Sequence, residues 1–242
     1  MAAAGAGVGR AAGTTGDTAA LRETITHSLR HLLFIMVPAA LGLLILAPFI
    51  LETLFEWGGN FGAHSTLLSA RALRCYAPGL IVFSAAKVFV PAFYAMKDTR
   101  TPVRIGVYIV LLNLALNLIL ILTLPTYWKH AGMALSTVLA EAVGMTVLGI
   151  ILTRRVKQLQ WRSIWRSFAR SLLCAIVMGI SAWFCLQASM EMLDDWLPAK
   201  MAQIAAVSLA VATGAVVYFL LAFLLRAPEL KEIKEAITGA RK

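Results

Sequence analysis

Residues 76–103 read YAPGLIVFSAAKVFVPAFYAMKDTRTPV, and this stretch decides the fold class. Its apolar part is long enough to cross a bilayer, whose hydrocarbon core of about 30 Å requires about 20 residues of helix. Lys87 lies near its middle, where a lysine costs about 2.5–3.5 kcal/mol on insertion scales, so we expect Lys87 to face a protein interior or a watery cavity. The polar residues 97–100 end the run. After them, Thr101 is suited to cap the next helix and Pro102 to occupy its first turn.

Composition extends this conclusion to the whole chain of 242 residues. Hydrophobic residues make up 60% and charged residues only 14%, which is typical of integral membrane proteins and not of soluble domains. Helices are the default way to cross a bilayer, because they satisfy their own backbone hydrogen bonds. The sequence therefore predicts an all-α polytopic membrane protein with six transmembrane helices. The predicted spans are residues 32–51, 75–96, 105–124, 131–152, 171–190 and 202–225.

The distribution of Lys and Arg predicts the orientation. Seventeen of the 22 basic residues lie in the N-terminal segment, the second-to-third loop, the fourth-to-fifth loop and the C-terminal segment, whereas four lie in the three opposite loops. Cytoplasmic loops carry the excess of positive charge, so both termini are expected in the cytoplasm. The net charge of +10 then reflects topology, and no nucleic-acid partner is predicted.

These spans divide the chain into five segments. They are a disordered Ala/Gly/Thr-rich leader (1–20), a four-helix membrane region (21–152), a basic amphipathic cytoplasmic linker (153–170), a two-helix region with uncharged spans (171–225) and a cytoplasmic tail (226–242). In the linker, Arg162, Arg166 and Arg170 share one helical face, which suits anionic lipids at a membrane surface. A plain basic linker with interfacial tryptophans is the alternative. In the tail, a short surface helix with a solvated charged face is expected after Pro228.

Polar side chains at membrane depth are the candidate functional residues. Asn113 and Asn117 project from one face of the third span, and Thr137 and Glu141 form a stripe on the fourth together with Met133. Charges at this depth are functional by default, so we hypothesise that Lys87 and Glu141 share one polar interior and couple substrate movement to packing changes. In the simpler alternative, the Asn and Thr side chains form ordinary hydrogen bonds between helices, and Lys87 pairs with Glu141 or snorkels.

Metal-binding and enzymatic functions find little support in the sequence. The three cysteines, Cys75, Cys174 and Cys185, are odd in number and lie in or beside apolar spans, so a disulfide framework is not expected. The four histidines are scattered over loops and match no metal-ligand or catalytic spacing. We therefore predict no catalytic residues, no metal centre and no enzymatic activity.

Three runs of the sequence resemble a known family. GLIVFSAAKVFVPAFYAMKDTRTPVRIGV, LNLALNLILI and HAGMALSTVLAE are similar to the C-terminal half of the MurJ/MviN family of lipid II flippases, within the multidrug/oligosaccharidyl-lipid/polysaccharide exporter superfamily. The most specific matches are Lys87, Pro91, Phe93, Tyr94, Ala95, Asp98, Thr101, Pro102 and Val103.

The resemblance implies an architecture and a substrate. Spans one to four look like the last four helices of the C-lobe, and spans five and six look like the helix pair that forms a groove for the polyprenyl tail. The implied function is transport of an undecaprenyl-linked peptidoglycan precursor, lipid II, from the cytoplasmic to the external leaflet of the bacterial inner membrane, for cell-wall biogenesis.

A sodium site is also implied by the resemblance. It falls on Asn113, Asn117, the carbonyl of Met133 and Thr137. Sodium-binding members are expected to have Asp where this chain has Asn117, so a negative charge is missing. Coupling to Na⁺ or to the membrane potential is left open, and no other cofactor is expected.

Length sets the remaining expectation. The N-lobe that supplies cavity arginines in the family has no counterpart here, so this chain is expected to act with a separately encoded or missing N-lobe. Two alternatives remain. One is half of a related polysaccharide-lipid or drug exporter, and the other is a non-transporting membrane scaffold.

Overall fold

The computed structural model describes residues 18–57, 62–156, 159–194 and 196–230. Within these residues the regular structure is entirely helical, which confirms the predicted all-α fold. The helices are α2 (Thr18–Phe55), α3 (Ala63–Tyr76), α4 (Gly79–Ala95), α5 (Arg100–Thr123), the 3₁₀ turn η1 (Thr126–Trp128), α6 (Lys129–Arg155), α7 (Trp161–Asp194) and α8 (Ala199–Leu224).

The number of membrane spans agrees with the prediction when one broken helix counts as a single span. Five helices of the described residues are long and apolar enough to cross a membrane, and α3 and α4 pass the same test as a pair bent by 42°. This corrects the second predicted span, 75–96, which starts earlier, at Ala63, and is interrupted after Tyr76. Pro78 lacks the N–H that would continue the helical hydrogen bonding, and the helix breaks there.

Other segment boundaries also change. Residues 18–20 of the predicted leader already belong to α2, and residues 1–17 lie outside the described residues. The predicted linker, 153–170, is divided between the end of α6 and the start of α7, which continues without a break into the fifth span. A helix can continue beyond the membrane surface when its polar extension packs on other helices.

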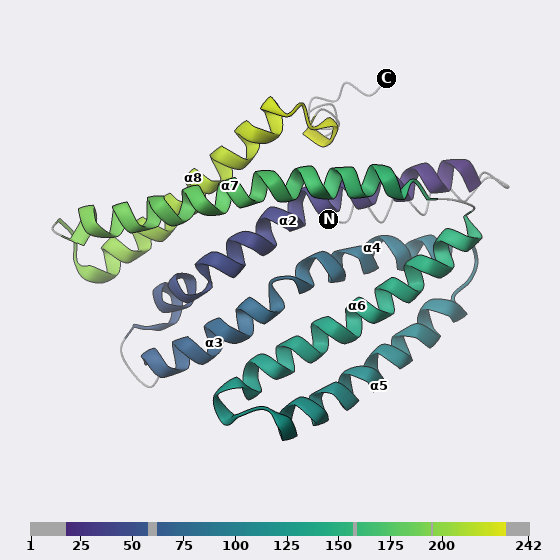
Figure 1. The fold of residues 1–242 in the computed structure, drawn as a ribbon, viewed down its shortest axis with the longest axis horizontal. Helices are drawn as coiled ribbons and strands as arrows, with labels where there is room; N and C mark the ends of the chain where they lie inside the picture. Colours follow the sequence, from purple (N-terminus) through teal and green to yellow (C-terminus); the bar gives the residue numbers. More distant parts are fainter. Residues whose placement is uncertain (1–17, 58–61, 157–158, 195, 231–242) are drawn as a thin grey trace.

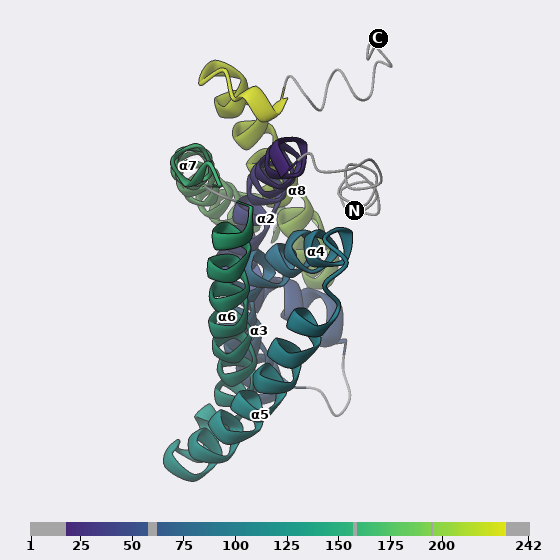
Figure 2. The same cartoon turned by 90° about the vertical axis from the view of Figure 1, so that its right-hand side faces the viewer.

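Helix α2 occupies the middle of the molecule. It contacts α3 and α4 on one side and α7 and α8 on the other, while α5 packs on α6 at the far edge (Figure 1). Figure 2 shows the same order from the side, with α5 and α7 at opposite ends. Only 6% of the apolar window of α5 is buried, because α6 covers only one side of this helix.

The hydrophobic core along α2 changes partners near Phe34. Buried Leu21, Ile25, Leu29 and Leu32 belong to a cluster with α4, α6 and the first turn of α7. Buried Phe34, Val37 and Leu46 of α2 belong to clusters with α7 and α8. Two prolines, Pro38 and Pro48, lie inside this 38-residue helix.

Two helix ends use a residue with positive φ. Lys97 (φ 60°) follows α4, and Arg226 (φ 48°) follows α8. At the first, the N–H of Lys97 donates to the Tyr94 carbonyl and that of Asp98 to the Phe93 carbonyl, which is the Schellman pattern that ends a helix. Arg226 and Ala227 repeat this pattern after α8, so the chain turns back toward α2.

Candidate functional site

An apolar cavity lies between α2, α7 and α8. Its volume is about 340 Å³, within the range of small-ligand sites. Pro38 and Gly42 of α2, Ala182 of α7 and Gly214 of α8 are among its lining residues. A Cβ atom built on Gly214 would lie 3.4 Å from Ala182 Cβ, which shows how closely α7 and α8 approach here. We call this space the groove cavity.

Tyr218 forms a boundary of the groove cavity. Its side chain is buried, and its hydroxyl donates a 2.6 Å hydrogen bond to the backbone carbonyl of Phe34. The two rings lie 5.3 Å apart between their centroids. Tyr218 therefore joins α8 to α2 beside the cavity through both ring packing and a hydrogen bond.

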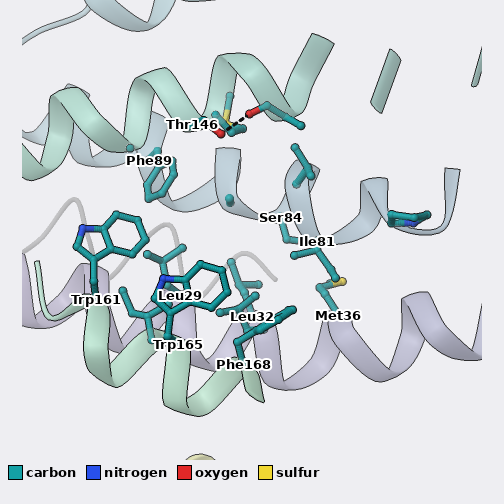
Figure 3. A pocket seen from close by; sticks show the side chains of 18 of the residues that line it. Leu29, Leu32, Met36, Ile81, Ser84, Phe89, Thr146, Trp161, Trp165 and Phe168 are labelled. Carbon is teal, nitrogen blue, oxygen red and sulfur yellow. Dashed lines mark hydrogen bonds between the residues drawn. The ribbon is translucent and has the colours of Figure 1, made fainter. Parts of the chain in front are cut away.

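A second, larger cavity lies between α2, α4, α6 and the first turns of α7. It measures about 530 Å³ and is also lined almost entirely by apolar side chains. In Figure 3, Trp161, Trp165 and Phe168 of α7 lie across this space from Ser84 and Phe89 of α4. The start of α7, predicted to be a linker at the membrane surface, thus forms one wall of a partly open cavity between helices.

The predicted ion-site residues form a hydrogen-bonded network. Asn117 Nδ2 donates to Asn113 Oδ1 (3.0 Å), and Thr137 Oγ1 donates to the Met133 carbonyl (3.0 Å). Ser136, which the sequence analysis did not single out, is fully buried and lies 2.7 Å from Asn117 Oδ1 and 2.8 Å from the Met133 carbonyl. Both amide oxygens accept hydrogen bonds, and the set carries no negative charge. These residues thus form an interhelical network, and a Na⁺ site at this place stays a prediction.

Asp98 holds three helices together at one end of the molecule. Its carboxylate accepts hydrogen bonds from the backbone N–H groups of Arg100 and Thr101, the hydroxyl of Thr101 and the guanidinium of Arg155. The two bonds from Thr101 are the main reason why the pKa of Asp98 falls to about 2, and Arg155 lowers it further. Asp98, rather than Thr101, therefore caps α5, while Pro102 lies in the first turn as predicted.

Glu229 forms a second charged cluster. Its side chain is 2% exposed, and its Oε1 atom accepts hydrogen bonds from Arg30 Nη2 (2.7 Å), Arg30 Nε (3.0 Å) and Ser167 Oγ (2.8 Å). Arg170 Nη1 lies 4.0 Å from Oε2. Burial raises the pKa of Glu229, but hydrogen bonds from its own backbone N–H, Arg30 and Ser167 outweigh burial and lower it overall. The expected solvated face of the tail is thus wrong for Glu229, and residues 231–242 lie outside the described residues.

The remaining predicted residues lie at different places. Lys87 and Tyr94 are exposed on α4, with Pro91 between them, and Glu141 is half-buried on α6. Lys87 lies two residues after the cavity-lining Ala85, about 200° away around the helix, so it projects from the opposite face of α4. A polar interior shared by Lys87 and Glu141 stays a prediction.

The three arginines of the predicted linker separate into two groups. Arg162 and Arg166 are exposed on α7, whereas Arg170 is half-buried beside Glu229. The exposed pair remains available for a membrane surface.

Spacing alone did not reveal Tyr218, Ser136, Arg155 or Glu229. For the contact of Tyr218, the sequence held one usable sign, which is Pro38. A proline inside a helix leaves the carbonyl four residues earlier, here that of Phe34, without its usual donor.

Long apolar helices, a broken span and apolar cavities between helices define a polytopic helical membrane protein. The sequence profile of the "Lipid II flippase MurJ" family matches residues 11–207, which is most of the chain. The chain belongs to this family.

Individual relatives agree with the family assignment. The chain is 32% identical over 167 residues to the "Probable lipid II flippase MurJ" of Haemophilus influenzae, covering 67% of this chain and 31% of that protein. It is 28% identical over 216 residues to the Vibrio cholerae protein of the same name, covering 88% and 39%. A solved structure named "Lipid II flippase MurJ, inward closed conformation" has the same fold, with a TM-score of 0.68, 20% identity, and coverage of 92% of this chain and 42% of that one. The chain thus spans about a third of the length of these two relatives.

Proposed function

We propose that this chain forms the groove-bearing C-terminal portion of a lipid II flippase and acts with an N-lobe to move an undecaprenyl-linked precursor between leaflets. In this proposal the groove cavity holds part of the polyprenyl tail. The observation that carries the proposal is the apolar cavity between α2, α7 and α8 in a chain that belongs to this family. The role is transport, without a covalent reaction.

The chemistry of the groove cavity suits a hydrocarbon chain. Its small residues let the helices approach, and dispersion contacts then hold the chain. A lipid tail in a bilayer is already surrounded by hydrocarbon, so burying it between helices gains little from the hydrophobic effect. Shape must supply the preference for the tail, and polar groups elsewhere must bind the headgroup.

We propose Lys87 and Glu141 as the polar residues of this chain that couple substrate movement to conformational change. Lys87 lies on the exposed face of α4, where a further part of the transporter has room to pack. Removing either charge, by Lys87→Met or Glu141→Gln, is expected to lower transport without unfolding the protein. No step of this proposal involves Na⁺, because the asparagine network carries no negative charge to attract a cation.

We further propose that the protein lies in the bacterial inner membrane with both termini in the cytoplasm. The basic segments expected there meet at one end of the molecule: Arg155 contacts Asp98, Trp161 Nε1 donates to Thr153 Oγ1 at 3.1 Å, and Arg30 contacts Glu229. At the other end, Lys200 Nζ donates to the Glu52 carbonyl at 3.3 Å. Anionic lipids at Arg162 and Arg166 fit this orientation.

Photo-cross-linking tests the groove. A photoreactive amino acid replaces Val211, which lines the cavity on α8, and Val216 on the same helix serves as the control because it is 66% exposed and does not line the cavity. In membranes containing lipid II, we expect the Val211 variant to cross-link lipid II several times more efficiently than the Val216 variant. Equal yields at the two positions would contradict tail binding in the groove cavity.

A further inference from the structure

Both internal prolines of α2 leave a carbonyl that another helix satisfies. In a regular helix, the N–H of residue 38 would donate to the Phe34 carbonyl, but Pro38 has no N–H. The hydroxyl of Tyr218, on α8, donates to this carbonyl instead, at 2.6 Å. This bond replaces the one that the proline removes.

The second proline repeats the arrangement independently. Pro48 removes the usual donor to the Leu44 carbonyl, and Arg74 Nε of α3 donates to this carbonyl at 3.2 Å. A carbonyl at membrane depth has no water to bind, so a donor from a neighbouring helix stabilises α2 at each proline. Each freed carbonyl is therefore satisfied by a partner outside α2.

Pro38 lies at a change in the packing partners of α2. Before it, α2 packs through Leu29 and Leu32 with α4, α6 and the first turns of α7. Around and after it, α2 packs through Phe34 and Val37 with α7 and α8. A change in the direction of α2 at Pro38 would therefore move α4 and α6 relative to α8 and the later turns of α7, which is how a hinge works.

The Tyr218 bond also lies at the groove cavity. Phe34, Pro38 and Tyr218 all line it. Because Tyr218 ties α8 to α2 at this point, breaking the bond lets the two helices separate along the wall of the cavity.

We propose that Pro38 is a hinge of α2 and that Tyr218 is its latch, a positioning residue that sets the width of the groove cavity by satisfying the Phe34 carbonyl. Passage of a hydrocarbon chain then requires the latch to open. The statement about the hydrocarbon chain rests on the proposed function, whereas the bond between Tyr218 and the Phe34 carbonyl does not.

A double-mutant cycle tests the latch without any lipid substrate. Tyr218→Phe removes only the hydroxyl, and Pro38→Ala restores the missing N–H. If Tyr218 serves the carbonyl that Pro38 frees, Tyr218→Phe speeds amide exchange of residues 35–42 on the order of fivefold in the native chain, the effect of losing one hydrogen bond of ordinary strength. In the Pro38→Ala background, the same substitution has little effect.

Controls make the result specific. Tyr108→Phe, on the exposed face of α5, is expected to change nothing. Arg74→Met is expected to speed exchange only around residues 44–52, and Pro48→Ala is expected to remove that effect. If Tyr218→Phe alone is too unstable to accumulate in the membrane, normal accumulation of the double variant with Pro38→Ala supports the latch. Failure of the single and the double variant alike overturns it.

Two outcomes of the cycle contradict the latch. No change on Tyr218→Phe, or the same change in the native chain and in the Pro38→Ala background, means that the hydroxyl does not act through the proline and overturns the proposal. The yield of lipid cross-links at Val211 gives a second readout, and we expect Tyr218→Phe to raise it. Loss of cross-linking in every variant while the cycle behaves as expected would reject tail binding and leave the latch intact.

Discussion

At Asp98, one carboxylate receives hydrogen bonds from the start of α5 and from Arg155 at the end of α6, directly after α4 ends. Glu229, in the turn after α8, likewise accepts hydrogen bonds from Arg30 of α2 and Ser167 of α7. The two residues stabilise the same end of the molecule by placing a low-pKa carboxylate against arginine. Asp98 lies in a motif that the sequence analysis recognised, whereas Glu229 does not, because its partner Arg30 is 199 residues away.

The lowered pKa of Asp98 predicts a dependence on pH. The ordinary pKa is 3.8 and the folded value is about 2, so the folded state favours the carboxylate. The stabilisation is complete above the ordinary pKa and is lost as the pH falls from about 4 to 2. The thermal midpoint in detergent is expected to fall over this range in the native protein, and less steeply in Asp98→Asn. Parallel curves for the two proteins would refute this, and Glu23→Gln serves as an exposed control.

Removing Glu229 is expected to destabilise the protein strongly. Arg30 is 14% exposed, so Glu229→Ala leaves a nearly buried charge without its main partner. Breaking a buried pair in this way costs on the order of 3 kcal/mol. Removing both charges, as Arg30→Met with Glu229→Leu, is expected to cost much less. Thermal unfolding of the single and double variants checks this, and an equally unstable double variant would count against the pair.

At the scale of helices, α5 depends on α6. It is held there by the bond between Asn117 and Ser136 and by the close approach of Ile109 to Gly144. The sequence placed both helices correctly from their apolar lengths. It did not show how far α2 and α7 extend beyond their spans, because the extensions are polar and are stabilised by packing on other helices.

Gly144→Ala is expected to push α5 away from α6. A Cβ atom at this position would overlap the Ile109 side chain, so that side chain has to move. Overpacking of this kind costs about 1–3 kcal/mol. Gly106→Ala on α5 is the matched control, because no atom lies within 4 Å of the added Cβ. Thermal stability in detergent should fall for Gly144→Ala only, and Ile109→Val should restore part of it.

At the scale of the whole molecule, the sequence predicted the helical fold, six spans and the family. The fold and the spans follow from the lengths of the apolar segments, and the family follows from the run around Lys87. Each of these signals lies within a short stretch of sequence. The groove boundary could not be predicted in this way, since Tyr218 meets Phe34 across 184 residues and only the three-dimensional arrangement brings them together. Lys87 and Glu141 remain predictions for the same reason, because their partners depend on how the helices of a complete transporter pack.

The central claim is that this chain supplies the C-terminal portion of a lipid II flippase. The most direct test is a chimera in which the region of the Haemophilus influenzae relative that matches this chain is replaced by the corresponding residues of this chain. In a strain depleted of its own flippase, we predict that the chimera restores growth, whereas the same relative lacking that region does not. A chimera that inserts into the membrane at normal levels but leaves the strain unable to grow would contradict the claim.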